Sequence, residues 1–134
     1  TGNDLEREFA LAASVDIRPG DLCTMNSSGK LLPNATAADV DPEVIVALEN
    51  DIIGDGIGVS YTEDDEAVRG WFPQPGDECY MWLETANNAA INASLESAGA
   101  GNLQLLSTGK HIFTAIEALN NVSGSDARIR VRRV

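Results

Sequence analysis

The chain has few of the side chains on which most enzyme and metal sites depend. Its 134 residues include one histidine, His111, and two cysteines, Cys23 and Cys79. The lone histidine stands in "GKHIF" with no nucleophile beside it, which excludes a catalytic triad or a His-based metal site. We therefore expect His111 at a surface or strand end. We predict no catalytic, cofactor-binding or metal-binding residues and no enzyme activity.

The cysteines are also too few and too widely separated to define redox chemistry. Cys23 and Cys79 form no CxxC pair. This spacing favours two small buried thiols, and it leaves one buried disulfide open as an alternative.

Positive charge is scarce, with 9 basic against 21 acidic residues and a net charge of −12. Only Lys30 and Lys110 are lysines. Such a surface repels nucleic-acid phosphates and anionic lipid, so we predict no nucleic-acid partner and no membrane. No apolar run approaches the roughly 20 residues of a membrane span. The acidity has two interpretations: an ordinary acidic protein, or adaptation to a very salty cytoplasm.

Closely spaced turn signals leave no room for long helices. They fall at residues 18–21, 26–30, 54–56, 74–77 and 98–102, which allows strands of about five to seven residues. The segment "ECYMWLE" (78–84) is apolar on both faces and predicts a central strand covered on both sides. A single helical turn suits "ETANNAAI" (84–91). The final "ARIRVRRV" (127–134) alternates and predicts a closing strand with one apolar and one cationic face.

The chain does contain a loose internal repeat. "VIVALEN" (44–50) is echoed by "TAIEALNN" (114–121), and "IRPGDLCTMNSSGKLL" (17–32) by "INASLESAGAGNLQLL" (91–106). We interpret each unit as strand, Gly-containing turn, strand, connector, strand. The expected fold is mainly β: a small β-barrel domain, residues 15–134, built from two loosely related strand-turn-strand units.

Residues 1–14 have an ambiguous pattern. Leu5 and Phe9 have helical spacing, whereas Phe9 and Leu11 alternate with alanine as in a strand. We expect an extended N-terminal arm that adds one strand to a partner's sheet and places Phe9 and Leu11 in partner pockets. The alternative is that the arm pairs within its own domain.

Four further patterns have ordinary structural explanations. "GDGIG" (54–58) lacks the GK[ST] of a phosphate loop and is interpreted as a turn. "EDDE" (63–66) fits a solvated hairpin end better than a Ca²⁺ loop. The sequons at Asn26, Asn34, Asn92 and Asn121 are interpreted as turn chemistry. Core packing is favoured over a carbohydrate-stacking platform for the four residues Tyr61, Trp71, Tyr80 and Trp82.

In their order and spacing, six blocks of the chain resemble the capsid decoration, or cement, proteins of tailed viruses. These are "VDIRPGDLCTMNSSGKLL", "VIVALEN", "YTEDDEAVRGWFPQPGDECYMWLE", "INASLESAGAGNLQLL", "AIEALNN" and "ARIRVRRV". The resemblance runs from about Glu6 to the C-terminus. It implies a β-tulip-type domain, usually a trimer, on the outer capsid surface of the virion, where it staples neighbouring major capsid protein subunits and uses no cofactor.

Two features depart from that family. The acidity exceeds what the family leads us to expect, which suggests a virus of a halophilic host such as an archaeon. The second repeat has "NAS" where the first has Gly20 and Asp21.

The resemblance predicts a protein made in the host cytoplasm and carried on the virion. Its candidate partner-binding residues are Phe9 and Leu11 in the arm, and Arg128, Arg130 and Arg132 in the last strand. We expect these arginines to face acidic surface of a neighbouring subunit or of the capsid protein, with a plain solvent face as the alternative. The rival functions are a head-fibre or tail module, a carbohydrate-binding domain and a small acidic hydrolase.

Overall fold

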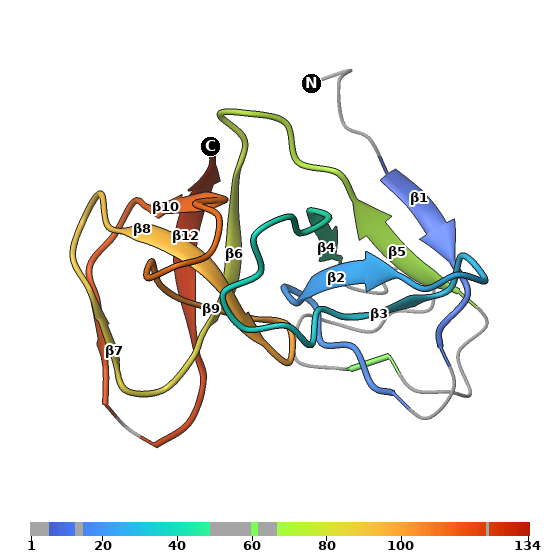
Figure 1. The fold of residues 1–134 in the computed structure, drawn as a ribbon, viewed down its shortest axis with the longest axis horizontal. Helices are drawn as coiled ribbons and strands as arrows, with labels where there is room; N and C mark the ends of the chain where they lie inside the picture. Colours follow the sequence, from blue (N-terminus) through green and yellow to red (C-terminus); the bar gives the residue numbers. More distant parts are fainter. Residues whose placement is uncertain (1–5, 13–14, 49–59, 62–66, 123) are drawn as a thin grey trace.

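The computed structural model describes residues 6–12, 15–48, 60–61, 67–122 and 124–134. Throughout these ranges the regular structure is β, arranged as two units that lie side by side (Figure 1). The first unit holds β1 (Glu6–Phe9), β2 (Leu22–Met25), β3 (Leu31–Pro33), β4 (Ile45–Ala47) and β5 (Val68–Trp71). The second holds β6 (Glu78–Leu83), β8 (Ser94–Gly99), β9 (Asn102–Leu105), β10 (Phe113–Ala115) and β12 (Ala127–Arg133). A small pair, β7 (Asn87–Ala89) and β11 (Leu119–Asn121), extends the second unit.

The two units have the same strand order. The first runs β1-β5-β4-β2-β3, and the second is a closed barrel, β6-β12-β10-β8-β9. The barrel closes through a parallel pairing of Leu83 with Leu103. In the first unit a parallel bridge between Leu11 and Leu31 takes the same place. The predicted small β-barrel built from two related units is confirmed.

Strand registers define the repeat residue by residue. Met25 pairs with Leu31 in the first hairpin, and Ser97 pairs with Leu103 in the second. From Glu6 to Pro33, each residue therefore corresponds to the one 72 positions later. The backbone bond from Gly20 N to Ala47 O (2.7 Å) likewise recurs from Asn92 N to Ala115 O (2.8 Å).

This register corrects the alignment expected from the sequence. Ile17 corresponds to Ala89, not to Ile91, because Ile17 bridges Tyr61 in the way that Ala89 pairs with Leu119. The echo of "VIVALEN" in "TAIEALNN" is also out of register. The structural counterpart of residues 44–47 is residues 112–115, since Ile45 and Phe113 occupy the same place beside β2 and β8.

The N-terminal segment belongs to the first unit. Strand β1 pairs antiparallel with β5, and Phe9 lies opposite Val68. Phe9 is 3% exposed and Leu11 is 9% exposed, both in the core of the first unit. The predicted partner-bound arm is therefore wrong for residues 6–12. These residues pair with β5 and, through Ala10 and Ala12, with Leu31 of their own domain, which is the alternative that the sequence left open.

Two other local expectations need correction. Strand β6 is not covered on both sides, because Met81 and Leu83 are buried while Tyr80 is 49% exposed. In residues 84–91 the structure has a turn and strand β7 in place of a helical turn. Asn87 supports this turn by donating to the carbonyl oxygens of Glu84 and Thr85.

Two core clusters lie inside the units, and the first unit contributes to both. Phe9, Ile17 and Val68 belong to the first cluster. Leu22 and Val46 sit on strands of the first unit but pack into the cluster of the second. Strands β2 and β4 therefore have apolar side chains on both faces, and burial of the second face joins the two units.

At one equivalent position, Pro33 in β3 and Leu105 in β9, neither hairpin has a free outward-facing backbone donor. The Leu105 N–H donates to Asn87 Oδ1 at 3.0 Å. The residue that corresponds to Leu105 in the first unit is Pro33, which has no N–H.

Candidate partner-binding surface and the junction between the units

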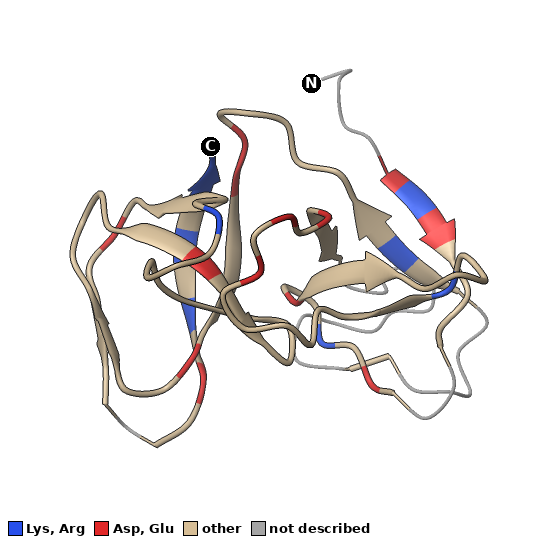
Figure 2. Cartoon of the chain, in the orientation of Figure 1, with Lys and Arg blue, Asp and Glu red and all other residues tan. Residues whose placement is uncertain are grey.

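The last strand places its arginines on one face. Ile129 and Val131 on β12 are fully buried, whereas Arg130 and Arg132 are exposed. The predicted alternation of β12 is confirmed. Figure 2 shows the basic residues of β12 interrupting an otherwise sparsely charged barrel wall.

Strand β6 supplies the other half of this face. Arg132 lies opposite Glu78, Arg130 opposite Tyr80, and Arg128 opposite Trp82. Arg130 donates to Glu78 Oε1 at 2.9 Å across the strands. We call the set Glu78, Tyr80, Arg130 and Arg132 the β6–β12 outer face. Its regular strands hold charged and aromatic groups at the surface in fixed positions.

Arg128 does not belong to this exposed surface. Its guanidinium lies 4.9 Å from the centre of the Trp82 ring and donates to Pro19 O at 2.8 Å. Pro19 lies in the first unit, so Arg128 joins the two units. The expectation that Arg128 faces a partner's acidic surface is wrong, because contacts within the chain occupy its side chain.

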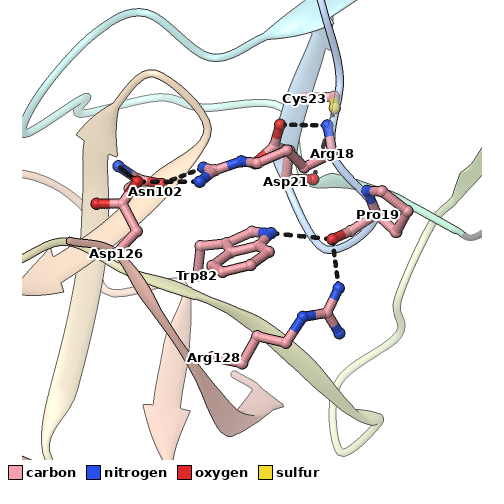
Figure 3. A network of polar contacts seen from close by, with 8 residues as sticks. All are labelled: Arg18, Pro19, Asp21, Cys23, Trp82, Asn102, Asp126 and Arg128. Atoms are coloured by element: carbon pink, nitrogen blue, oxygen red, sulfur yellow. Dashed lines mark hydrogen bonds and ion pairs between the residues drawn. The ribbon is translucent and has the colours of Figure 1, made fainter. Parts of the chain in front are cut away.

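The junction is a polar network around Trp82 (Figure 3). Arg18 lies over the ring of Trp82 at 4.5 Å, and the figure shows Arg128 on the other side of the indole. The indole Nε1–H donates to Pro19 O at 2.9 Å. Trp82 is thus held between two guanidinium groups, a favourable arrangement for a ring with a negative face.

Arg18 links the turn of the first unit to the barrel of the second. It pairs with Asp21 Oδ1 at 2.9 Å and with Asp126 Oδ2 at 2.9 Å, and it also donates to Asn102 Oδ1. Asn102 in turn donates to Asp126 at 3.1 Å. These charge-assisted bonds are stronger than neutral ones, which favours a fixed orientation of the two units.

Asp21 is the most buried carboxylate of the junction, with 2% exposure. Burial raises the pKa of Asp21 to about 6, although the backbone hydrogen bond and the charge of Arg18 lower it. The turn itself is formed by Pro19 and Gly20. Gly20 has a φ of 93°, and a Cβ there would lie 3.2 Å from Tyr80 O. Only glycine fits this left-handed position so close to strand β6.

The first unit has a counterpart of the β6–β12 outer face. Arg69 on β5 pairs with Glu6 on β1, as Arg130 pairs with Glu78. The register makes these pairs equivalent. Glu6 and Arg69 were not predicted from the sequence, although the spacing of 72 residues between Glu6 and Glu78 could have indicated them.

The aromatic residues do not assemble a sugar-stacking platform. Tyr61 is buried, Trp82 is covered by arginines, and Trp71 packs against the core of the second unit. Only Tyr80, among these four, has an exposed ring. Core packing, the favoured interpretation, is confirmed for Tyr61 and Trp71 but is wrong for Tyr80, which is exposed, and Trp82 packs at the junction instead of in a core.

The described residues contain no cluster of three or more His, Cys, Asp or Glu side chains that could hold a metal ion. His111 lies two residues before β10, and its Nε2 is 3.0 Å from Thr114 Oγ1. "GDGIG" (54–58) and "EDDE" (63–66) fall outside the described residues.

Both cysteines are free. Burial raises the pKa of the Cys23 thiol, and it raises the pKa of Cys79 to about 12. Thiols with such raised pKa values form little thiolate and are poor nucleophiles at neutral pH.

The asparagines of the sequons largely form turns and buried bonds. Asn26 Oδ1 accepts from Ser28 N and Lys30 N, and Asn34 Oδ1 accepts from Thr36 N. Asn34 and Asn121 are each 3% exposed.

Comparison with known proteins adds no identification. No protein-family model matches the chain, and no curated protein matches it. No membrane-spanning helix is found in the described ranges, whose regular elements are all strands.

Proposed function

We propose that this chain is a structural virion protein that binds the outer surface of an assembled viral capsid and bridges major capsid protein subunits. The observation that carries the proposal is the β6–β12 outer face. Arg130 and Tyr80 are exposed there on rigid strands, in a chain with a net charge of −12. The resemblance of the six sequence blocks to capsid decoration proteins supplies the partner.

The β6–β12 outer face lies on regular strands, which suits binding to a surface that exists only in the assembled capsid lattice. No backbone segment has to become ordered when a partner covers this face, and the entropy lost on binding is limited to exposed side chains such as Arg130. Tyrosine and arginine are the residue types that most often dominate protein interfaces. The expected partner surface on the major capsid protein is acidic where it meets Arg130 and contains an apolar site for Tyr80.

Capsid stabilisation then follows from mass action and needs no catalytic residue. A protein that binds the closed lattice, and not the dissociated subunits, stabilises the lattice by RT ln(1 + [L]/Kd) at each site. A concentration of one hundred times Kd contributes about 2.7 kcal/mol per site. Repetition over a shell turns a modest affinity into a large total stabilisation against outward pressure from the packed genome.

The test is co-sedimentation of the purified chain with shells assembled from the major capsid protein of the same virus. Wild-type protein should bind, and the double variant Tyr80→Ser/Arg130→Ser should bind at least about tenfold more weakly. The double variant Lys30→Ser/Lys110→Ser removes two charges from exposed sites away from this face and is the control. Shells that do not retain the wild-type chain at any salt concentration would refute the proposal.

Electron cryo-microscopy of virions with and without the chain would distinguish the capsid from the alternative positions. Density over the capsid lattice supports decoration. Density confined to a head fibre or to the tail would instead support the alternative virion module.

A further inference from the structure

Glu96 on β8 is a buried carboxylate that the proposed function does not use. It is 0% exposed, although it follows Leu95, whose side chain lies in the barrel core, so Glu96 projects from the outer side of the barrel wall. None of the ion pairs among the described residues includes Glu96. A carboxylate buried without a cation has to be compensated by hydrogen bonds.

Four hydrogen bonds converge on this carboxylate. Glu96 Oε1 accepts from the backbone N–H groups of Ser107 at 3.1 Å and Gly109 at 2.7 Å. Its Oε2 accepts from Ser107 Oγ at 2.8 Å and from Gln104 Nε2. Three of these four bonds come from residues 106–110, which follow β9 and lead toward β10. We call residues 106–110 the connector lid, because they fold back over the carboxylate.

The connector lid also contacts the first unit. A Cβ on Gly109 would lie only 2.6 Å from the carbonyl carbon of Ala38, so the two backbones are packed directly against each other. The Lys110 N–H donates to Asp39 O at 2.9 Å. The lid is thus tied to Glu96 on one side and to residues 38–39 on the other, and this contact between the units shares no residue with the polar junction network.

We propose that the connector lid is an acid-sensitive latch, which the ionised Glu96 carboxylate holds closed against the first unit and which opens when that carboxylate takes up a proton. All four groups around the carboxylate donate, and the two backbone N–H groups on Oε1 cannot reverse that role. A proton is accommodated only at Oε2, where it displaces the bond from Gln104 or from Ser107 Oγ. The remaining bonds lose their charge assistance and become about half as strong.

The electrostatics of the site agree with this direction. Burial raises the pKa of Glu96, but the hydrogen bonds from Ser107, Gln104 and Gly109 outweigh burial and hold the pKa below its ordinary value of 4.5. Because the folded pKa is lowered, the stability that these bonds contribute is complete above pH 4.5. It is lost as the pH falls through the pKa of the folded chain.

Other charged groups near the lid act at different bonds. Strands β8, β9 and β10 carry no charged residue besides Glu96, and the neighbouring segments carry Lys110, His111, Asp39 and Asp41. Asp39 Oδ1 accepts from the Asp41 N–H at 3.1 Å and makes none of the four bonds to the lid. The Asp41 amide therefore reports protonation of Asp39 separately from protonation of Glu96.

Amide NMR of the purified chain between pH 7 and pH 3 tests the latch. The amide shifts of Ser107 and Gly109 should titrate together with a midpoint below 4.5, because both bond to Glu96 Oε1. Hydrogen exchange, corrected for its intrinsic pH dependence, should become at least about tenfold faster at Gly109 and Lys110 as this midpoint is passed. The Leu22 amide, which bonds to Gly101 O on the other side of the junction, should keep its protection.

Two variants test the role of the carboxylate itself. Glu96→Gln places an amide NH₂ among donors, so Gly109 and Lys110 should exchange fast already at pH 7 and show no further change in acid. Gln104→Ala removes one donor, which should move the midpoint of the Gly109 shift to higher pH. Glu117→Gln is the matched control, because Glu117 accepts a backbone N–H away from the lid, and it should keep the wild-type response.

Three results would overturn the proposal. The first is that the Ser107 and Gly109 shifts do not titrate below pH 4.5. The second is that exchange at Lys110 and at Leu22 rises together, which would mean that the chain loosens as a whole. The third is that Glu96→Gln folds and exchanges like wild type at pH 7. If Glu96→Gln does not fold, wild type and Gln104→Ala still decide the matter, and no capsid is involved, so failure of the latch leaves the proposed function standing.

Discussion

Asp21→Asn is the variant that most directly tests how the junction is held. Asp21 is 2% exposed, and its pKa is about 6 in the folded chain against 3.8 for the unperturbed group. Each pKa unit corresponds to about 1.4 kcal/mol, so ionised Asp21 lowers the stability of the fold by about 3 kcal/mol relative to the protonated form. Because the folded pKa is raised, the stabilising contribution of the protonated form is complete below pH 3.8. It is lost as the pH rises through about 6.

Urea unfolding at pH 4.5 and at pH 7.5 measures this contribution. About 2 kcal/mol of this free-energy difference falls between the two pH values, because the Asp21 carboxyl of the unfolded chain, with its pKa of 3.8, is still mostly ionised at pH 4.5. The free energy of unfolding of wild type should fall by this amount relative to Asp21→Asn as the pH rises. Comparison with the variant removes the change in general charge repulsion, which both proteins share.

Asp77→Asn is a matched control. Asp77 closes a second Pro-Gly turn in the same way, accepting from Gln74 N at 2.8 Å as Asp21 accepts from Arg18 N at 2.8 Å. The change in the free energy of unfolding of Asp77→Asn measures the loss of one turn carboxylate outside the junction. A difference between wild type and Asp21→Asn that is the same at both pH values would refute the reasoning about the buried carboxylate.

Three further outcomes are expected. Trp82→Phe keeps the ring between the two guanidinium groups but loses the bond to Pro19 O, which should lower the free energy of unfolding by about 1 kcal/mol in urea titrations; no change would show that the bond contributes nothing. A chain lacking residues 1–12 should fail to give a cooperative melt, because it loses β1 and the buried Phe9, whose truncation alone is worth about 3–5 kcal/mol; normal melting would restore the idea of a dispensable arm. Association measured by sedimentation should weaken as the ionic strength falls from 1 M to 0.01 M. The Debye length then grows from about 3 Å to about 30 Å, so that whole chains of charge −12 repel one another. An unchanged oligomer would remove the case for adaptation to high salt.

Local patterns in the sequence were sufficient for the turns and for the last strand. The Pro-Gly turns at residues 18–21 and 74–77 and the alternation of β12 follow from side-chain geometry within a few residues. The repeat was recognised, but its register was wrong because equivalent positions rarely share identity and often differ in size and polarity, as Leu22 and Ser94 do. Phe9 corresponds to Met81 and Cys23 to Leu95, which no comparison of letters would align.

The arm and the arginines show the limit of local reasoning. A short segment with Phe9 and Leu11 can pair with any sheet edge, and only the fold brings β5 beside it. Alternation placed Arg128, Arg130 and Arg132 on one face correctly. It could not show that Arg128 meets Pro19, which is 109 residues away in the sequence and adjacent only after the units dock.

The ends of the two hairpins have a consequence for behaviour in concentrated solution. A β-edge recruits further strands through free N–H groups, and this is the route to fibrils and to amorphous aggregates. At Pro33 the donor does not exist, and at Leu105 the amide of Asn87 already occupies it. Strand addition is thus blocked at the same position in both units. Strand addition along the hairpins is therefore disfavoured at this one position in each unit, and β1, at the other edge of the first sheet, is left as the edge through which backbone pairing with a further strand would have to begin.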